Sequence, residues 1–178
     1  FALGGEANLY WLWRAHRAGQ ELMHGSVVSS AGRPLHTFDE VRAVAAGLRK
    51  AGAFLNGTRP VNTGLAIHYS CMAWWLFAFQ TINHGFIYHE SLIRSVWRPL
   101  VEAQYRPDLI DAAADLTSYR LVLSPFLPAL DEAGLRERLL RWIRAGGVWV
   151  AGPFTDIRDM AAAKFPHGPY GSLEEWAG

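Results

Sequence analysis

Short apolar runs separated by polar turns mark the strands expected in the second part of the chain. Four such runs predict strands, at residues 65–69, 109–110, 119–124 and 148–151. The runs are mostly apolar without a polar alternation, which is typical of strands buried on both faces of a sheet. Because helical stretches lie between them, the pattern predicts a mostly parallel sheet covered on both faces, a doubly wound α/β domain of the flavodoxin or amidotransferase type.

Apolar positions three and four residues apart predict the helices that connect these strands. One helix is expected over residues 89–104, kinked or started afresh near Pro99. A second is expected to begin at Asp131 as its N-cap and to end at Gly146 and Gly147. The buried face of this second helix is expected to carry Leu135, Leu139, Trp142 and Ile143.

The first part of the chain predicts one strand, a long loop and one helix. Residues 9–13 form an aromatic and apolar run that is typical of a buried strand. Residues 15–34 contain several glycines and polar residues, as surface loops do. Thr37 and Glu40 fit a capping box at the start of a helix that Gly52 is expected to end.

A turn-rich stretch at residues 56–63 is expected to link two units, residues 1–55 and residues 64–178. Of the 178 residues, 51% are apolar and 19% charged, so the chain can bury a substantial core. The net charge of +1, with both signs intermixed, offers no surface for nucleic acid or an anionic membrane. No signal-peptide pattern and no stretch approaching the roughly 20 apolar residues of a membrane span are found, so we expect a cytoplasmic protein.

The loop after the first predicted strand carries the most suggestive polar pair. Glu21 and His24 stand three residues apart and could present a carboxylate and an imidazole to one ligand. A carboxylate accepts hydrogen bonds from neighbouring sugar hydroxyls, and an imidazole donates or accepts one. Trp11 and Trp13 alternate with Leu12, so both are expected on one face of the strand, where an aromatic ring could form a wall for a sugar. The alternative is an ordinary surface pair beside tryptophans that only pack.

Other catalytic chemistries find no support in the sequence. It contains no nucleophile-elbow, phosphate-loop or dinucleotide-binding motif, so we expect no cofactor. An amidotransferase would carry a nucleophilic cysteine on the turn after a strand, but that turn begins with Ser124 and the single cysteine, Cys71, lies near the linker. A metal site is not expected either, because Glu21 and His24 supply two ligands where zinc needs three or four.

Several segments resemble the glycoside hydrolase family 42 β-galactosidases. Residues 10–14 (Tyr-Trp-Leu-Trp-Arg) and 18–25 (Ala-Gly-Gln-Glu-Leu-Met-His-Gly) resemble the last strand of that family's catalytic barrel and the loop that follows it. Residues 115–122 (Asp-Leu-Thr-Ser-Tyr-Arg-Leu-Val) and 145–150 (Ala-Gly-Gly-Val-Trp-Val) resemble its trimerisation domain. The resemblance covers most of the chain.

The resemblance implies a fold and a set of residue roles. Residues 1–55 would be the C-terminal remnant of a (β/α)8 barrel, whose active site lies at the carboxyl ends of the strands. Residues 64–178 would be a trimerisation domain, truncated at its end. Glu21 and His24 would bind galactose hydroxyls, and Trp11 would line the sugar subsite. In the family the acid/base and nucleophile of retaining hydrolysis lie on earlier strands, so this chain alone is expected to be inactive.

The resulting hypothesis is the C-terminal part of a retaining β-galactosidase that hydrolyses terminal β-D-galactosides. Its partners would be a galactoside substrate and further copies of itself, in a trimer. Residues 77–90 match no pattern of the family, so a different glycoside substrate stays open. His84, His89 and Glu90 in this segment are expected to make loop or subunit contacts rather than to bind a metal. The alternative function is a non-catalytic α/β interaction or oligomerisation module.

Overall fold

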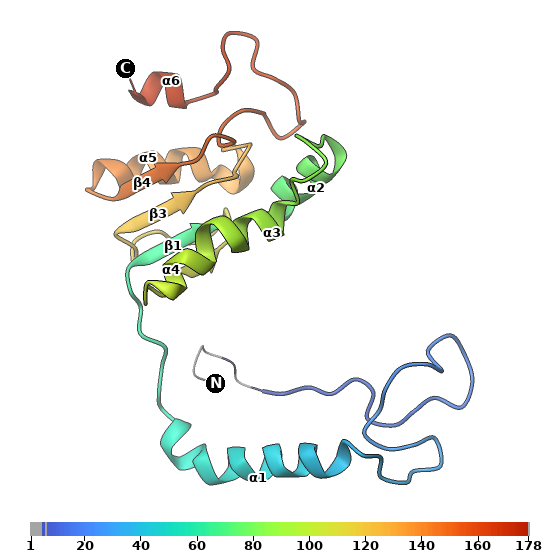
Figure 1. The fold of residues 1–178 in the computed structure, drawn as a ribbon. Coiled ribbons are helices and arrows are strands. Elements are labelled where there is room, and N and C mark those ends of the chain that lie inside the picture. Colours follow the sequence, from blue (N-terminus) through green and yellow to red (C-terminus); the bar gives the residue numbers. More distant parts are fainter. Residues whose placement is uncertain (1–4, 6, 178) are drawn as a thin grey trace. The chain divides into compact units, whose positions relative to one another are not determined.

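The computed structural model of the chain describes residue 5 and residues 7–177, and the chain divides into two compact units (Figure 1). Unit 1 comprises Phe1–Val61 and unit 2 comprises Asn62–Gly178. The described part of unit 1 contains one helix, α1 (Phe38–Leu55), and no strand. Unit 2 contains a sheet and the other helices that the structure describes.

The strand predicted over residues 9–13 does not form. The chain bends at Trp11 and Trp13, and just after this run Arg14 forms a bridge that pairs it in parallel with Val28. Leu12 is buried, whereas Trp11 is 75% exposed. The prediction of a buried strand was wrong because the described part of unit 1 offers no sheet that this aromatic run could join.

Helix α1 begins where predicted but is capped differently. Thr37 occupies the N-cap, yet its hydroxyl donates to the carbonyl of Ser26 (3.4 Å) and forms no capping bond. The predicted end at Gly52 was wrong too, since the helix continues to Leu55 and the left-handed residue is Gly57, with φ of 85°. A glycine inside a helix costs only about 1 kcal/mol, which does not stop a helix by itself.

Unit 2 is built on a four-stranded parallel sheet. Its strands are β1 (Leu65–His68), β2 (Asp108–Ile110), β3 (Leu121–Ser124) and β4 (Val148–Ala151). The strand order is β2-β1-β3-β4, and every neighbouring pair is parallel. The predicted parallel α/β fold is therefore confirmed, in the order of the flavodoxin-like doubly wound class.

The connections between the parallel strands place helices on both faces of the sheet of unit 2. They are α2 (Cys71–Phe79), α3 (Tyr88–Leu92), a π-helical turn η1 (Ile93–Trp97), α4 (Arg98–Glu102), a 3-10 turn η2 (Glu132–Gly134), α5 (Leu135–Arg144) and α6 (Leu173–Ala177). From β1 the chain passes through α2, α3 and α4 to β2, at one edge of the sheet. From β3 it passes through α5 to β4, at the other edge. Because such crossovers are right-handed, the two sets of helices cover opposite faces (Figure 1).

Helix α5 fixes one layer of the core. Leu135, Leu139 and Trp142 are buried as predicted, with Ile143 packed against the same cluster. Residue 147, just after the end of the helix, must be a glycine, because a Cβ there would lie 2.2 Å from the ring of Trp142. The predicted N-cap at Asp131 was wrong: the chain first makes the 3-10 turn η2, and the Asp131 side chain forms no capping bond.

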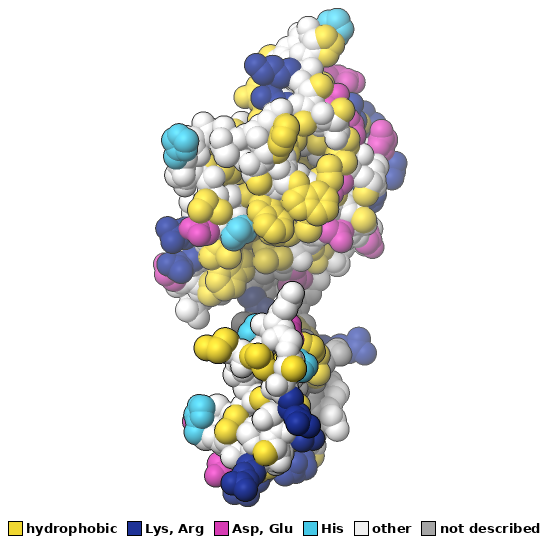
Figure 2. All heavy atoms as spheres, turned by 90° about the vertical axis from the view of Figure 1, so that its right-hand side faces the viewer, with side chains coloured by type: hydrophobic (Ala, Val, Ile, Leu, Met, Phe, Trp, Pro, Cys, Tyr) yellow, Lys and Arg dark blue, Asp and Glu magenta, His cyan; other side chains and the backbone are white. Residues whose placement is uncertain are grey.

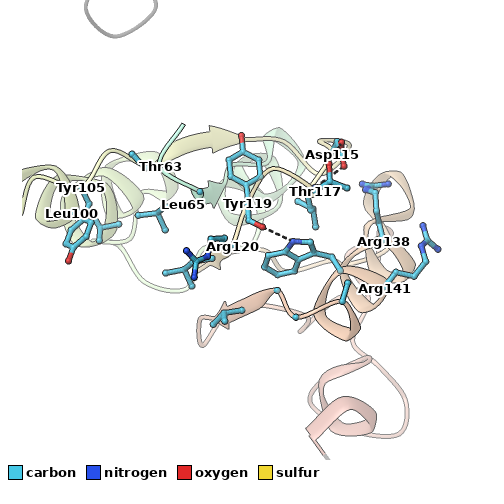
Figure 3. A pocket seen from close by; sticks show the side chains of 18 residues that line it. Thr63, Leu65, Leu100, Tyr105, Asp115, Thr117, Tyr119, Arg120, Arg138 and Arg141 are labelled. Carbon is cyan, nitrogen blue, oxygen red and sulfur yellow. Dashed lines mark hydrogen bonds between the residues drawn. The ribbon is translucent and has the colours of Figure 1, made fainter. Parts of the chain in front are cut away.

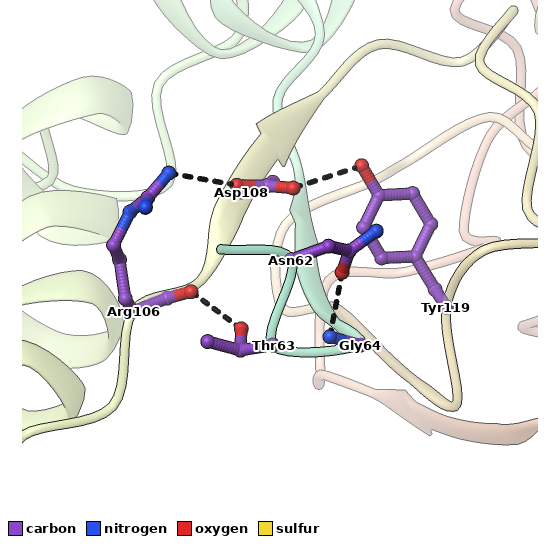
Figure 4. Close-up of polar contacts among 6 residues, drawn as sticks. All are labelled: Asn62, Thr63, Gly64, Arg106, Asp108 and Tyr119. Carbon is purple, nitrogen blue, oxygen red and sulfur yellow. Dashed lines mark hydrogen bonds and ion pairs between the residues drawn. The ribbon is translucent and has the colours of Figure 1, made fainter. Parts of the chain in front are cut away.

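At the amino end of the sheet, side-chain contacts hold β1 and β2 together (Figure 4). Thr63 donates to the carbonyl of Arg106 (2.6 Å), and the Arg106 guanidinium lies 3.8 Å from the Asp108 carboxylate. Tyr119 also donates to Asp108 (3.2 Å), while the Asn62 side chain accepts the amide of Gly64 (2.7 Å). These contacts fix the register in which the chain enters the central strand.

At the carboxyl end of the sheet, a buried polar network joins three strands. His68 Nδ1 lies 2.7 Å from Ser124 Oγ, and the indole N–H of Trp149 donates to the same oxygen (2.8 Å). His68 Nε2 is buried without a partner. Burial, together with the charge of Arg138, lowers the pKa of His68 to about 4, and Asp111 opposes this shift. His68 is therefore neutral in the folded protein at pH 7.

This burial makes the stability of unit 2 dependent on pH. Because the folded pKa of about 4 lies below the ordinary 6.5, the unfolded chain binds the proton first as pH falls. The contribution of neutral His68 to the free energy of unfolding is fully present above pH 6.5. As the pH falls to 4, the free energy of unfolding should decrease by about 3 kcal/mol. The measurement is urea unfolding across this range, in which His68→Gln, which does not titrate, should show a flatter profile. His84→Gln, an exposed histidine, is the matched control, and a profile for His68→Gln that equals the wild-type one would contradict the assignment.

Candidate functional site

The loop at residues 16–24 of unit 1 is closed at its base by backbone hydrogen bonds. The amide of Val27 donates to Leu12 (3.1 Å), and the amide of Val28 donates to Trp13 (2.8 Å). Arg14 then locks the base, since its Nε and Nη2 both donate to the carbonyl of Ser30, at 3.0 and 2.7 Å. The polar residues of the loop are thus presented from a fixed base even though unit 1 has little core.

A tight turn at the tip of the loop brings Glu21 and His24 together. The amide of His24 donates to the carbonyl of Glu21 (3.1 Å), and Gly19, with φ of 106°, reverses the chain just before. The His24 Nδ1 lies 4.0 Å from Glu21 Oε1. This is too long for a hydrogen bond, so the two side chains are neighbours that a ligand could bridge.

His16 completes the cluster, and the sequence spacing did not identify it. Its Nε2 lies 3.1 Å from Glu21 Oε2, while all three side chains remain partly exposed. One carboxylate oxygen of Glu21 is therefore engaged by His16, and Oε1 is left for a ligand. A histidine five residues before a glutamate in a loop follows no helical or strand period, which is why no pattern singled it out.

The cluster borders a hollow of about 820 Å³ in unit 1. Trp11, His16 and His24 line it, and this volume falls in the usual range for small-molecule sites. The peptide bond between Trp11 and Leu12 is cis. Trp13 does not line the hollow, because its ring packs on Phe38 with 6.3 Å between the ring centroids. The expectation that Trp11 and Trp13 lie on the same face was therefore wrong.

Unit 2 has a larger groove at the amino end of its sheet, of about 1060 Å³ (Figure 3). Apolar residues and three arginines line it, namely Arg120, Arg138 and Arg141. Trp142 forms part of the wall and donates to the carbonyl of Tyr119 (3.1 Å). No cysteine or histidine is among its lining residues, and its polar residues include Asp115 and Thr117, whose hydroxyl donates to the Asp115 carboxylate (2.7 Å).

The candidate nucleophiles of unit 2 are not arranged for catalysis. Ser124 ends β3 but is fully buried in the His68 network, and Cys71 is exposed at the start of α2. Nucleophilic catalysis needs such a group beside a base and open to substrate. The described part of unit 2 therefore presents no nucleophile of the amidotransferase kind at the end of β3.

The histidines of the unmatched segment do not form a metal site with their neighbours. His84 is exposed, His89 packs edge-on against Trp74 at 5.7 Å, and Glu90 pairs with Arg94 at 3.4 Å. Within residue 5 and residues 7–177, no group of three or more His, Cys, Asp or Glu side chains is placed to hold a metal ion. In the same part of the chain, no helix combines the length and apolarity needed to cross a membrane.

Two family models match the chain. The β-galactosidase trimerisation domain matches residues 63–178, and the β-galactosidase model of glycoside hydrolase family 42 matches residues 1–51. The larger match covers well over half of the chain, and it spans the sheet and helices of unit 2. The smaller match contains the His16, Glu21 and His24 cluster.

Characterised proteins and solved structures agree with these matches. β-Galactosidase YesZ of Bacillus subtilis is 33% identical over 179 residues, which cover all of this chain and 26% of that protein. The β-galactosidase of the Antarctic haloarchaeon Halorubrum lacusprofundi has a TM-score of 0.76 at 27% identity, over 98% of this chain and 25% of that chain. A catalytic mutant of Gan42B, a GH42 β-galactosidase from G. stearothermophilus, gives 0.75 at 27% identity, over 94% and 24%. The chain spans about a quarter of the length of the curated relatives it matches.

Arg14 adds two side-chain hydrogen bonds to the backbone ladder at the base of the loop. Arg14→Met keeps the aliphatic stem but removes both hydrogen bonds to Ser30, each worth on the order of 1 kcal/mol at such an exposed position. Hydrogen exchange of the Ala15 and Val28 amides should become about tenfold faster. Arg17→Met is the matched control, because Arg17 makes no contact of this kind. Unchanged exchange in Arg14→Met would show that the backbone ladder alone holds the loop.

Proposed function

This chain belongs to glycoside hydrolase family 42, and on that premise we propose that it is the C-terminal part of a retaining β-galactosidase. The proposed reaction is hydrolysis of terminal β-D-galactosides. Retaining hydrolysis needs two carboxyl groups about 5 Å apart, one as acid/base and one as nucleophile. We place both outside this chain, which would supply sugar-binding residues and the association domain and would be inactive by itself.

The observation that carries this proposal is the His16, Glu21 and His24 cluster beside the hollow that Trp11 lines. Glu21 Oε1 would accept hydrogen bonds from galactose hydroxyls, and the exposed His24 imidazole would donate or accept another. His16 would hold the carboxylate in place from behind, at 3.1 Å. Trp11, which is largely exposed, would give the apolar face of the sugar ring a surface to pack on.

The two parts of the chain would have separate tasks. We assign residues 1–55 to the end of the catalytic barrel, residues 56–63 to a linker and residues 64–178 to the association domain. Support for the last comes from the description of the matching family model as a trimerisation domain. The partner would be further copies of the same protein, in a trimer, and the location would be the cytoplasm.

Removal of the Glu21 charge tests the sugar-binding role. In the full-length protein, Glu21→Gln keeps the shape of the side chain but weakens hydrogen bonds to hydroxyls, so kcat/KM for a chromogenic β-galactoside should fall about 10- to 100-fold. Asp39→Asn is the matched control, because Asp39 lies on the surface of α1 in an ion pair with Arg42 (3.2 Å).

Three outcomes of that experiment carry different meanings. Equal losses in Glu21→Gln and Asp39→Asn would remove Glu21 from the sugar site. Turnover by this chain without further sequence would place the catalytic carboxylates among its own residues. An inactive full-length wild-type protein that still associates would favour a non-catalytic association module.

The trimer is tested by mass. Sedimentation equilibrium of the full-length protein should give three times the subunit mass at micromolar concentration, because a domain of this kind is expected to close a ring of identical contacts. A monomer, or a dimer that does not grow with concentration, would contradict the trimer while leaving the galactoside proposal to its own assay.

A further inference from the structure

Helix α2 is a surface helix whose side chains are all apolar or weakly polar. Its nine residues read Cys-Met-Ala-Trp-Trp-Leu-Phe-Ala-Phe, without one charged or amide side chain. Surface helices of globular domains normally present a polar stripe to water, and a helix that is apolar all round is normally buried all round. The composition of α2 therefore indicates that a second surface covers its outward side.

The two sides of α2 differ sharply in burial. Ala73 and Phe77 are buried, and Phe77 packs with Phe86 (5.2 Å) and Tyr88 (6.0 Å) in an aromatic cluster. This cluster fixes the helix firmly on unit 2. The outward side is consequently presented as a rigid surface, which limits the entropy lost when a partner binds.

The outward side carries three exposed aromatic residues. Trp75 is 58% exposed and Phe79 is 84% exposed, and Trp74 lies beside them. Cys71 and Ala78, also exposed, lie on the same face, Cys71 one turn before Trp74 and Ala78 one turn after it. We call these five residues the α2 face.

Neighbouring elements extend the α2 face and give it a border. The ring of Trp74 meets that of His89 on α3, and Ile93 lies one turn further along, partly exposed. The Glu90 and Arg94 ion pair lies on the same helical stretch and supplies a polar margin. Figure 2 shows a broad hydrophobic area on this side of unit 2, with charged residues around it. An apolar centre with a polar margin is the usual anatomy of a protein interface.

The size of the exposed area suits the centre of an interface. With about 200 Å² for a whole aromatic side chain, the three aromatic residues expose on the order of 400 Å². One partner contributes about 800 Å² to a standard-size interface. The α2 face therefore matches the apolar centre that carries most of the binding energy, with the polar margin completing the contact.

We propose that the α2 face is buried against a second copy of this chain. This inference rests on the proposed function, in which residues 64–178 hold the subunits together. The family model described as a trimerisation domain covers all of α2, which favours an identical subunit over an unrelated protein. In a closed ring of three, each contact joins two different surfaces. The α2 face of one subunit therefore meets a different surface of the next subunit and not that subunit's α2 face.

A sugar is the less suitable occupant. Sugar sites combine an aromatic surface with side chains that hydrogen-bond hydroxyls, as around Trp11 in unit 1. Trp75 and Phe79 have only apolar residues around them on α2. A protein surface, in contrast, gains by removing such side chains from water without needing polar groups at the centre.

The test is made in the full-length protein with Trp75→Ser and Tyr105→Ser. Both variants remove an exposed aromatic side chain from unit 2, but Tyr105 is 60% exposed at the amino-end groove, away from α2. By sedimentation equilibrium, Trp75→Ser should weaken subunit association about 30-fold or more, as expected for a central tryptophan. Tyr105→Ser should associate like the wild type.

Cys71 provides a second readout. In the assembled wild-type protein its thiol should be protected from a maleimide reagent, and in Trp75→Ser it should label at least tenfold faster, measured on the peptide that contains Cys71.

A Cys71 that labels equally in both proteins, or a wild-type protein that is monomeric, would overturn the proposal. The proposal would also be overturned if Tyr105→Ser dissociated the subunits and Trp75→Ser did not. The same holds if the Trp75→Ser variant remained associated but lost affinity for galacto-oligosaccharides. A protein without β-galactosidase activity whose association depends on Trp75 would overturn only the proposed reaction.

Discussion

Strand β1 carries the constraint on which unit 2 depends, because all four of its residues are buried. A buried parallel strand must pair its backbone on both sides and have both faces covered by other elements. β2 and β3 meet the first requirement, and the helices on the two faces meet the second. The end of β1 then delivers a histidine into the interior, and Ser124 and Trp149 from the next two strands provide the polar contacts there. The neutral state of His68 follows from the same burial that defines the fold.

Unit 1 is organised by hydrogen bonds rather than by a core. Helix α1 buries none of its residues, and Leu12, Val27 and Val28 are the buried apolar residues of its described part. Their backbones form the ladder that Arg14 reinforces. The candidate sugar site is therefore defined locally: a turn sets the distance between Glu21 and His24, and the ladder sets where the turn begins. Such a site can keep its internal geometry without a surrounding sheet.

The sequence predicted the elements whose patterns are local, and it missed those that depend on neighbours. The spacing of Leu135, Leu139 and Trp142 sufficed for α5, because one face is apolar and the other charged. α2 has no such contrast, so no periodicity revealed it. The aromatic run at residues 9–13 has the composition of a strand, but strand formation requires partners that composition does not supply. In the candidate site, Glu21 and His24 stood out by spacing, whereas His16 joined them only through the path of the loop.

The exposed aromatic residues of the two units are distinguished by their polar neighbours. Trp11 lies at a hollow with His16 and His24, so a ligand there can exchange its water hydrogen bonds for protein ones. Trp75 and Phe79 have no such neighbours on α2, and a ligand rich in hydroxyls would lose hydrogen bonds there without replacement. A complementary apolar surface loses nothing of that kind and gains from the water released. Aromatic exposure alone therefore does not identify an occupant; the hydrogen-bonding capacity within reach of each ring separates a sugar subsite from a subunit contact.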